Sequence, residues 1–303
     1  MGKTAFCFPG QLQGRPLLQD GHPLKRDPHF QEWTARASSQ TKIDLLPFLF
    51  ENKEKGDEFT LKLQISTYLF SVIHFHRLRA SGWTPDILAE HSMGIYAALA
   101  ASEAITFEEG LFITESIGRL LAKEGVLHRG AMASVIGLPL EGVQKICQDL
   151  DGYPLFIANY NGSMHYVLSG EAEGVEKAVS LALSRKAVSA GLLPFDTALH
   201  SPSLFSLGKE IMNFLKDIRI RPLRFPILNH WTIKPLRKEE VKDFLSQEIG
   251  RPVYWVRCVE KLIQDGFDQF IEVGHESTLT KLIRWIDRDK AAFSAGERLG
   301  ERG

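Results

Sequence analysis

The sequence predicts an α/β protein in which a large domain with a parallel sheet carries a smaller inserted domain of the ferredoxin-like βαββαβ type. Three observations support this prediction. Short apolar runs closed by turn residues alternate with helical periodicity over residues 1–125 and 200–303. The segment 126–199 has the order β-α-β-β-α-β, which is that of a split βαβ unit. One apolar run of the large domain ends in a sharp turn that leads at once into a helix of small residues.

The elements of the large domain follow from the spacing of apolar residues. Thr4–Phe8 is a β-rich run closed by Pro-Gly, which predicts a buried first strand and its turn. Residues 14–58 are polar and contain proline, which favours loops and short helices, whereas residues 60–79 repeat apolar side chains at helical spacing. The other predicted elements are helices over about 107–123, Glu239–Glu248, Val256–Gln264 and Leu279–Asp287, strands over Pro226–Asn229 and Phe267–Val273, and a frayed tail or final short helix after about residue 290.

The inserted domain combines four extended runs with two helical ones. The predicted strands are Ala131–Leu138, Leu155–Asn159, His165–Ser169 and Val188–Phe195, and the predicted helices are Leu140–Leu150 and Ala172–Arg185. The chain then returns to the large domain near His200. A small domain carried on a larger one leaves a cleft between them, which is a common place for a ligand.

The composition argues against several functional classes. Lys and Arg number 36 against 37 Asp and Glu, so no nucleic acid and no membrane surface is expected as a partner. There is no signal-peptide pattern, and no apolar run approaches the roughly 20 residues that span a bilayer. The three cysteines, Cys7, Cys147 and Cys258, lack metal-ligand spacing. The sequence therefore favours a cytoplasmic protein with reduced thiols and no metal site.

The most informative stretch is Ile87–Leu99, in which an apolar run ends in a Glu-His-Ser-Met-Gly turn around Ser92. This is the layout of a nucleophile elbow, which lifts a serine hydroxyl to the top of a sheet, and it predicts an α/β-hydrolase-like large domain. The backbone N–H of Met93 would lie at a helix N-terminus, where it can stabilise an oxyanion. Glu90 departs from the pattern, which has glycine two residues before the serine. An ordinary strand–turn–helix junction is the alternative interpretation.

A serine nucleophile needs a base, and His200 is the best-placed histidine. It lies where the inserted domain rejoins the large one, directly before a turn forced by Pro202, and can meet Ser92 across the cleft. An exposed loop histidine is the alternative interpretation, and His275, at a predicted strand end, is a weaker rival. The second N–H of an oxyanion hole can come from the Gln11 backbone, in the loop after the first strand.

Together these segments resemble the malonyl-CoA:acyl carrier protein transacylase family, which includes the acyltransferase domains of polyketide synthases. Six motifs occur in the family's order over nearly the whole chain, and six in order are specific although each alone is weak. The motifs are Phe8-Pro9-Gly10-Gln11, His91-Ser92-Met93-Gly94, Gly130-Ala131-Met132-Ala133, Ala158-Asn159-Tyr160-Asn161, His200-Ser201-Pro202 and Glu272-Val273-Gly274.

The resemblance implies a mechanism and a set of roles. Ser92 would be acylated by an acyl thioester such as acyl-CoA, with His200 as base and then as acid. The backbone N–H groups of Gln11 and Met93 would form the oxyanion hole, and a backbone carbonyl at about Glu248 would orient the histidine. The acyl group would pass to the phosphopantetheine thiol of an acyl carrier protein by ping-pong transfer, with no metal or bound cofactor.

The resemblance also places Ile117, Leu199, His91 and Asn159 at the acyl pocket, and one of these departs from the family. Malonyl-specific members carry an Arg thirteen residues before the Gly-Ala-Met-Ala strand, which binds the extender carboxylate as a bidentate pair. Here that position is Ile117, and Arg119 lies about 200° further round a helix. A malonyl carboxylate would then be buried and unpaired. An uncharged acyl group, such as acetyl or a short fatty acyl, is therefore expected.

Two further positions depart from the family's pattern. Glu90 replaces the elbow glycine, and Leu12-Gln13-Gly14 replaces the usual Gly-Ser-Gln after Gln11. The first substitution bears on the geometry of the elbow, and the second bears on the position of an oxyanion donor.

Three other functions remain open. An acyl-carrier-protein hydrolase would use the same Ser92 and His200 with water in place of the thiol. A malonyl-CoA:acyl carrier protein transacylase would need Arg119 or another cation to reach the carboxylate. A non-catalytic carrier-protein docking protein would need neither Ser92 nor His200. Because carrier proteins are acidic, a basic patch near the cleft is expected, with the candidates Arg119, Arg129, Lys186, Lys209 and Arg251.

Overall fold

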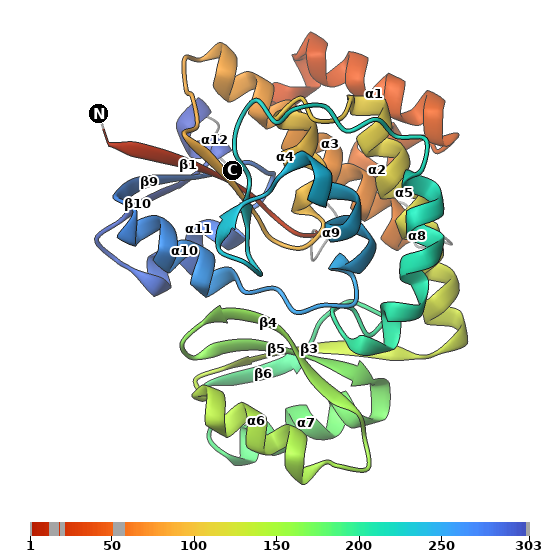
Figure 1. Cartoon of the computed structure of the whole chain (residues 1–303), viewed down its shortest axis with the longest axis vertical. Helices are drawn as coiled ribbons and strands as arrows, with labels where there is room; N and C mark the ends of the chain where they lie inside the picture. Colours follow the sequence, from red (N-terminus) through yellow and green to blue (C-terminus); the bar gives the residue numbers. More distant parts are fainter. Residues whose placement is uncertain (1, 12–17, 19–21, 51–57, 301–303) are drawn as a thin grey trace.

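The sheet of the large domain has four parallel strands in the order β10-β9-β1-β2 (Figure 1). The computed structural model describes residues 2–11, 18, 22–50 and 58–300. The strands are β1 (Lys3–Phe8), β2 (Ile87–Glu90), β9 (Phe267–Glu272) and β10 (Ala291–Ser294). A parallel bridge between Leu88 and Ile227 adds a short segment beside β2.

Both faces of this sheet are buried, because successive side chains of β1 enter different cores. Phe6 and Phe8 pack in the larger core, whereas Ala5 and Cys7 pack in the smaller core on the other side. The helices that contribute to the larger core are α1 (Pro28–Thr41), α2 (Leu45–Phe50), α3 (Phe59–Ala80), α4 (Gly94–Ala101), α5 (Phe107–Leu127), α8 (Gly208–Leu215), α9 (Val241–Glu248) and α12 (Ala295–Leu299). The smaller core is built with α10 (Trp255–Gln264) and α11 (Thr278–Ile286).

A second, antiparallel sheet lies below the large domain in Figure 1. Its strand order, β4-β5-β3-β6, is that of the predicted ferredoxin-like unit. The strands are β3 (Gly130–Ile136), β4 (Leu155–Gly162), β5 (His165–Glu171) and β6 (Ser189–Leu192), and the helices are α6 (Leu140–Asp149) and α7 (Ala172–Ser184). The helices cover the face of this sheet that is turned away from the large domain. The opposite face is therefore free to form one wall of a site.

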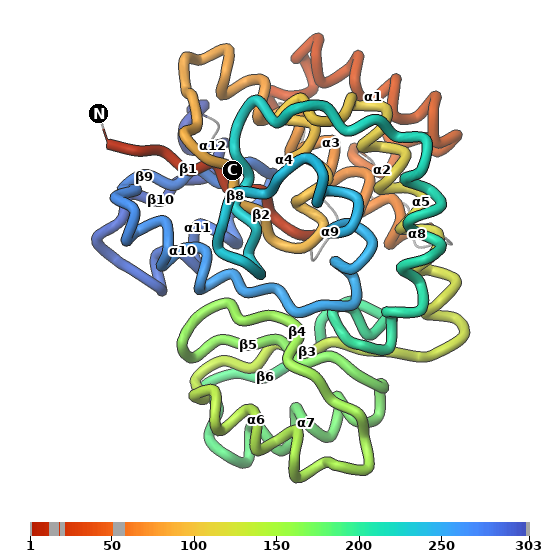
Figure 2. The backbone as a smooth tube through the Cα atoms, viewed as in Figure 1, coloured from red at the N-terminus to blue at the C-terminus, as the bar shows by residue number. Residues whose placement is uncertain are grey.

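The remaining elements are short. They are the 3₁₀ helices η1 (Pro23–Arg26), η2 (Pro202–Leu207) and η3 (Lys238–Glu240) and the two-residue strands β7 (Leu228–Asn229) and β8 (Lys234–Pro235). In Figure 2 the segment around β8 crosses in front of the main sheet.

The structure confirms the α/β fold with a parallel sheet and an antiparallel small-domain sheet, and it corrects details. The segment after residue 290 is not a frayed tail, because Ala291–Ser294 pairs in parallel with β9 as the fourth strand. The second strand of the small domain continues to Gly162, so the connection that follows it is shorter than predicted. The predicted strand Pro226–Asn229 is regular only at its last two residues. The domain boundaries at residues 126 and 199 stay a prediction.

Two further observations concern the described part of the chain. Among its helices, none combines the length and the apolar composition that a bilayer crossing requires. Within the same ranges, no three His, Cys, Asp or Glu side chains are grouped so that they could hold a metal ion.

Candidate active site

Ser92 lies on a tight turn between β2 and α4. Its φ of 57° is in the left-handed region, which a residue with a side chain adopts only where the surrounding structure holds it. The His91 N–H donates to the Phe8 carbonyl at 3.0 Å and ties the turn to β1. A Cβ at Gly94 would lie 2.2 Å from the same carbonyl oxygen, so the close approach of the two segments requires glycine there. The turn thus has the geometry of a nucleophile elbow.

Glu90 is buried behind this turn beside His230. Its side chain is fully buried, and its Oε1 lies 3.4 Å from His230 Nε2. His230 Nδ1 accepts a hydrogen bond from the Tyr254 N–H at 3.3 Å, so the proton of the neutral ring is on Nε2. Neither this Nε2 nor either Glu90 oxygen has a hydrogen-bond partner among the described residues. Burial and the Glu248 carboxyl raise the pKa of Glu90 well above its usual value, while burial lowers the pKa of His230. The substitution of the elbow glycine is therefore compatible with the turn.

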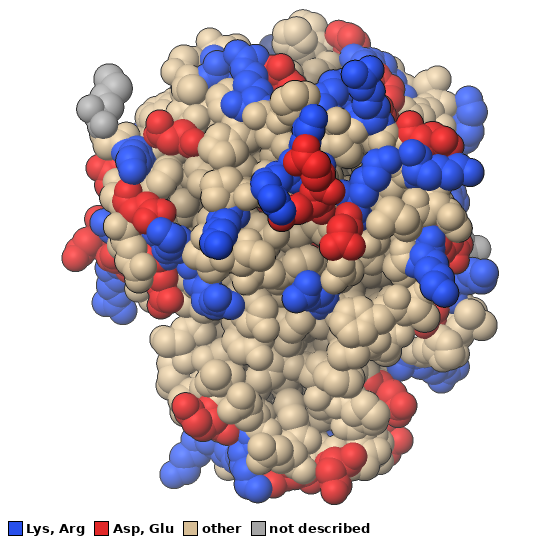
Figure 3. Space-filling view, in the orientation of Figure 1, with Lys and Arg blue, Asp and Glu red and all other residues tan. Residues whose placement is uncertain are grey.

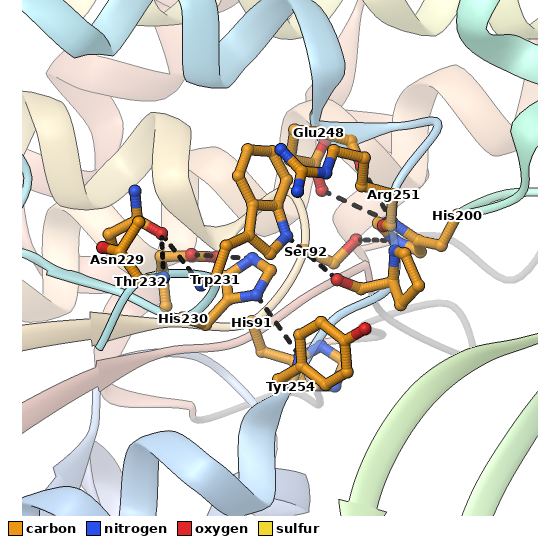
Figure 4. Close-up of polar contacts among 12 residues, drawn as sticks. His91, Ser92, His200, Asn229, His230, Trp231, Thr232, Glu248, Arg251 and Tyr254 are labelled. Carbon is orange, nitrogen blue, oxygen red and sulfur yellow. Dashed lines mark hydrogen bonds and ion pairs between the residues drawn. The ribbon is translucent and has the colours of Figure 1, made fainter. Parts of the chain in front are cut away.

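His200 and Ser92 are within hydrogen-bond distance in the structure (Figure 4). Ser92 Oγ lies 2.8 Å from His200 Nε2, and the backbone carbonyls of Glu248 and Arg251 each lie 3.1 Å from His200 Nδ1. The Nδ1–H donates to these carbonyls, so Nε2 is free to accept the hydrogen bond from the serine hydroxyl. Burial lowers the pKa of His200 to about 4, which keeps the ring neutral and able to take a proton at neutral pH.

The two groups predicted for an oxyanion hole lie beside Ser92. Gln11 and Met93 both line the same pocket as the serine. Met93 is the N-cap of α4, so its backbone N–H is among the first amides of the helix, which have no acceptor within it. The altered loop residues Leu12, Gln13 and Gly14 lie outside the described residues. The oxyanion role of the two N–H groups stays a prediction.

A cavity of about 300 Å³ contains the site. Residues of α3, α4, α5 and α11 line it from the large domain, and residues of β3, β4 and β5 line it from the small domain. The structure brings together all nine residues predicted for the site, because each of them lines this cavity. They are Gln11, His91, Ser92, Met93, Ile117, Asn159, Leu199, His200 and Glu248.

Some residues that line the cavity were not predicted from the sequence. Gln64 on α3 and Thr114 on α5 are buried and line the cavity. A polar residue on the buried side of an apolar helical pattern is the signal that indicates them. His165 lines the small-domain wall, where its Nε2 lies 3.0 Å from the Ser134 hydroxyl. The rival base His275 instead lies against another aromatic ring, in a stacked arrangement.

His91 has a structural partner on the small domain. Its Nε2 lies 2.9 Å from Asn161 Oδ1 and 3.3 Å from Asn159 Nδ2. Burial lowers the pKa of His91 to about 4, partly offset by the hydrogen bond to Asn161. These contacts join the elbow to β4, so they fix the small domain over the serine.

The described lining of the cavity offers no cation. It contains no Lys or Arg, whereas Glu248 and Glu276 contribute acidic groups. Ile117 occupies the position at which the resemblance expects an Arg, and it is buried in the lining. The Arg119 guanidinium contacts Glu115 and Glu58 at 2.9 Å each, and its side chain is about half exposed. The wall formed by α5 is therefore apolar where a bound carboxylate would need a positive charge.

The five basic residues proposed for a carrier-protein patch are not part of the described cavity lining. In Figure 3, Lys and Arg side chains lie mainly over the large domain and at the lower tip of the small domain. The described surface of the small domain that adjoins the large one is largely uncharged in this view. Arg251 covers the Trp231 ring at 4.1 Å from its centroid. In this view the Lys and Arg side chains above the small domain lie on the large domain, and the predicted basic patch stays a prediction.

This arrangement can support nucleophilic catalysis. The Ser92 hydroxyl has a neutral base at hydrogen-bond distance, and the base has its other nitrogen fixed by carbonyls. The N–H of Met93 lies at a helix N-terminus next to the serine, where developing negative charge is stabilised. The enclosed, partly apolar cavity beside them can hold a small acyl group.

The chain is similar to known acyltransferases over most of its length. Residues 24–295 match the family model described as the acyl transferase domain. The chain is 30% identical over 291 residues to the polyketide biosynthesis malonyl CoA-acyl carrier protein transacylase of Bacillus subtilis, covering 95% of this chain and 98% of the relative. It is 27% identical over 292 residues to the malonyl CoA-acyl carrier protein transacylase of the same organism, covering 95% and 92%.

Solved structures show the same fold. The malonyl CoA-acyl carrier protein transacylase of Coxiella burnetii superposes with a TM-score of 0.90 at 26% identity, covering 99% of this chain and 98% of that one. A malonyl-transacylase in complex with a type II polyketide synthase acyl carrier protein superposes with a TM-score of 0.87 at 26% identity, covering 96% and 94%.

Proposed function

We propose that this chain, which belongs to the acyl transferase family of malonyl-CoA:acyl carrier protein transacylases, transfers acyl groups from CoA thioesters to an acyl carrier protein. The observation that carries the proposal is the 2.8 Å contact between Ser92 Oγ and His200 Nε2 inside the cavity. The CoA donor and the carrier protein come from the names of the relatives, one of which is bound to an acyl carrier protein.

In the proposed reaction, Ser92 Oγ attacks the thioester carbonyl carbon while His200 Nε2 takes the hydroxyl proton. The backbone N–H groups of Gln11 and Met93 stabilise the oxyanion. The intermediate then collapses, the carbon–sulfur bond breaks, and His200 protonates the leaving thiolate. The carrier-protein thiol attacks the acyl-serine in the reverse order, with His200 again as base.

Malonyl is the acyl group that the comparisons favour. The two Bacillus subtilis relatives and the Coxiella burnetii protein are all named as malonyl CoA transacylases. These names support malonyl over the uncharged acyl group expected from the sequence. Malonyl is therefore the first candidate for the acyl group that this chain transfers.

An uncharged acyl group is the second candidate, and one observation favours it. Ile117 lies in the buried lining, and the described lining holds no Lys or Arg. A carboxylate buried there without a partner would cost several kcal/mol. Acetyl or a short fatty acyl would meet no such penalty against an apolar wall.

Intact-mass spectrometry after incubation with malonyl-, acetyl- and longer acyl-CoA tests the proposal. The expected result is a mass increase of one acyl group that is lost in Ser92→Ala. A malonyl adduct supports the first candidate, and an acetyl or longer adduct without a malonyl one supports the second. If none of the thioesters modifies the protein, the enzyme proposal is wrong and a docking role is favoured.

A second step separates transfer from hydrolysis. The acylated protein is mixed with a carrier protein that bears phosphopantetheine, and with the same carrier lacking it as a matched control. Transfer predicts that only the phosphopantetheine-bearing carrier gains the acyl mass. A hydrolase would lose its adduct at the same rate with either carrier, and neither carrier would gain mass.

A further inference from the structure

The Glu248 side chain, and not only its backbone carbonyl, faces the base of the site. Its carboxyl is 1% exposed and lines the cavity. Oε1 lies 3.8 Å from His200 Nδ1 and accepts no hydrogen bond from the described residues. Oε2 lies 3.5 Å from the Tyr96 hydroxyl. Figure 4 shows the carboxyl above the imidazole. Glu90 and Glu272 also have buried carboxyl oxygens without a donor among the described residues, but of these three carboxyls it is Glu248 that lies beside the base His200.

We propose that the Glu248 carboxylate is a positioning residue that stabilises the positive charge His200 acquires when Ser92 attacks. The inference rests on the proposed function, in which that charge arises. The Ser92 Oγ–H bond breaks, its proton binds His200 Nε2, and Oγ bonds to the electrophilic carbon. The proton then leaves with the thiolate, and Glu248 stays ionised throughout.

The two backbone carbonyls orient His200 but do not supply a full negative charge to stabilise its imidazolium form. They lie 3.1 Å from His200 Nδ1 and accept its N–H, which fixes the tautomer and the orientation of the ring. Carbonyls carry only partial charges, whereas a carboxylate at 3.8 Å places a full negative charge beside the imidazolium in a buried site. The carboxylate does not compete for the Nδ1 proton, because the carbonyls are closer. The two carbonyls thus orient the His200 ring, and the Glu248 carboxylate stabilises its positive charge.

Three ionisable groups from different elements lie near the Glu248 carboxyl. They are His200 in the loop after β6, Tyr96 on α4 and Glu90 on β2. Burial raises the pKa of Glu248 to about 7, against the lowering effects of the Tyr96 and Ser92 hydroxyls. Burial lowers the pKa of His200 to about 4. Glu248 therefore gains its charge near neutral pH, where His200 is already neutral, and its contribution should follow its own ionisation.

Glu248→Gln tests the inference because it keeps the backbone carbonyl and the side-chain size but removes the charge. Two rates at Ser92 are measured at about pH 5.5 and about pH 8: labelling by a fluorophosphonate, and acylation by an acyl-CoA that modifies the wild type. At the higher pH the variant should react roughly 10- to 100-fold more slowly than the wild type. At the lower pH, where the wild-type carboxyl is protonated, the two rates should agree within about twofold.

Two further variants control the experiment. Glu272→Gln removes another buried carboxyl whose pKa burial raises to about 7, but which accepts the Thr280 N–H and is not part of the described cavity lining. It should react like the wild type at both pH values. Tyr96→Phe removes a hydroxyl that lowers the pKa of Glu248, so it should move the rise in rate to higher pH. This variant tests the inference even if Glu248→Gln fails to fold.

Each outcome supports or overturns the inference. A loss of rate in Glu248→Gln that is confined to the higher pH supports it. Equal rates at both pH values overturn it, and so does the same loss at both, which would indicate a structural role. Because fluorophosphonate labelling needs no thioester, a wild type that is labelled but never acylated contradicts the proposed function and still reports on Glu248.

Discussion

Two buried glutamates flank the Ser92–His200 pair, and they differ in the partners that the fold gives them. Glu90, at the end of β2, faces His230, whose tautomer is fixed toward it by the Tyr254 N–H. Glu248, at the end of α9, accepts a hydrogen bond from the Tyr96 hydroxyl at Oε2, and its Oε1 lies 3.8 Å from Nδ1 of His200, the base of the site. Neither oxygen of Glu90 has a hydrogen-bond partner among the described residues. Both carboxyls are almost fully buried.

This difference separates a structural carboxyl from one coupled to chemistry. Burial raises the pKa of both carboxyls, so either one destabilises the fold when it ionises. They differ in what they face, because Glu90 lies beside His230 behind the elbow, whereas Glu248 lies beside the base that takes the Ser92 proton. We therefore expect Glu90 to affect the structure of the elbow and Glu248 to affect the rate of Ser92 acylation.

The largest effect on the rate of Ser92 acylation should come from removing His200, the base on which Glu248 is proposed to act. His200→Ala should lower the rate of Ser92 acylation by roughly 10³-fold, because the serine loses its base. In this background, Glu248→Gln should change the residual rate by less than about twofold, since no imidazolium forms. Rapid-quench mass spectrometry of the four proteins measures both effects. If Glu248→Gln slows the reaction equally with and without His200, the two groups act independently and Glu248 does not act through His200.

The pH dependence of stability should show the cost of the Glu248 charge. The folded-state pKa of about 7 is above the ordinary value of 4.5, so the folded state holds this proton more tightly than the unfolded state. The stabilisation is complete below about pH 4.5 and is lost as the pH rises through 7. Relative to Glu248→Gln, the wild type should lose about 3 kcal/mol of unfolding free energy over this range.

Urea denaturation of the wild type and Glu248→Gln at several pH values measures this loss. Glu272→Gln is the matched control, because burial raises the pKa of that carboxyl to a similar value in another part of the fold. Glu272→Gln should remove a separate pH-dependent loss of unfolding free energy, and this loss should add to that caused by Glu248. A difference between wild type and Glu248→Gln that is constant with pH would mean that the carboxyl has the same pKa in the folded and the unfolded protein.

Local patterns in the sequence predict much of this site. The elbow is a local feature, since strand, turn and helix follow one another within Ile87–Leu99. His200 stands out because it lies at the junction of two domains. The resemblance, through motifs spread over the chain, groups both with Gln11, Asn159 and the other lining residues. Such features can be predicted because each depends on a short segment with its own turn chemistry or motif.

Features that depend on distant pairing cannot be predicted in this way. The fourth strand, Ala291–Ser294, is too short to show a periodicity, and it is extended because β9 offers it an edge to pair with. The partner of Glu90, His230, is far along the chain and meets it only in the fold. Glu248 was expected to serve through its carbonyl, and only the packed structure shows its carboxyl beside His200.

The smallest effect should come from Glu90→Gln. The substituted side chain has nearly the size of Glu90, and the exchange breaks no hydrogen bond of the described residues, so unfolding free energy should change by less than about 1 kcal/mol. The rate of Ser92 acylation should stay within about threefold of the wild type at both pH values, since the elbow is held independently by the Phe8 carbonyl and Gly94. Urea denaturation and the acylation assay check both parts. A loss of rate at high pH as large as that of Glu248→Gln would show that the two carboxyls titrate as one coupled unit.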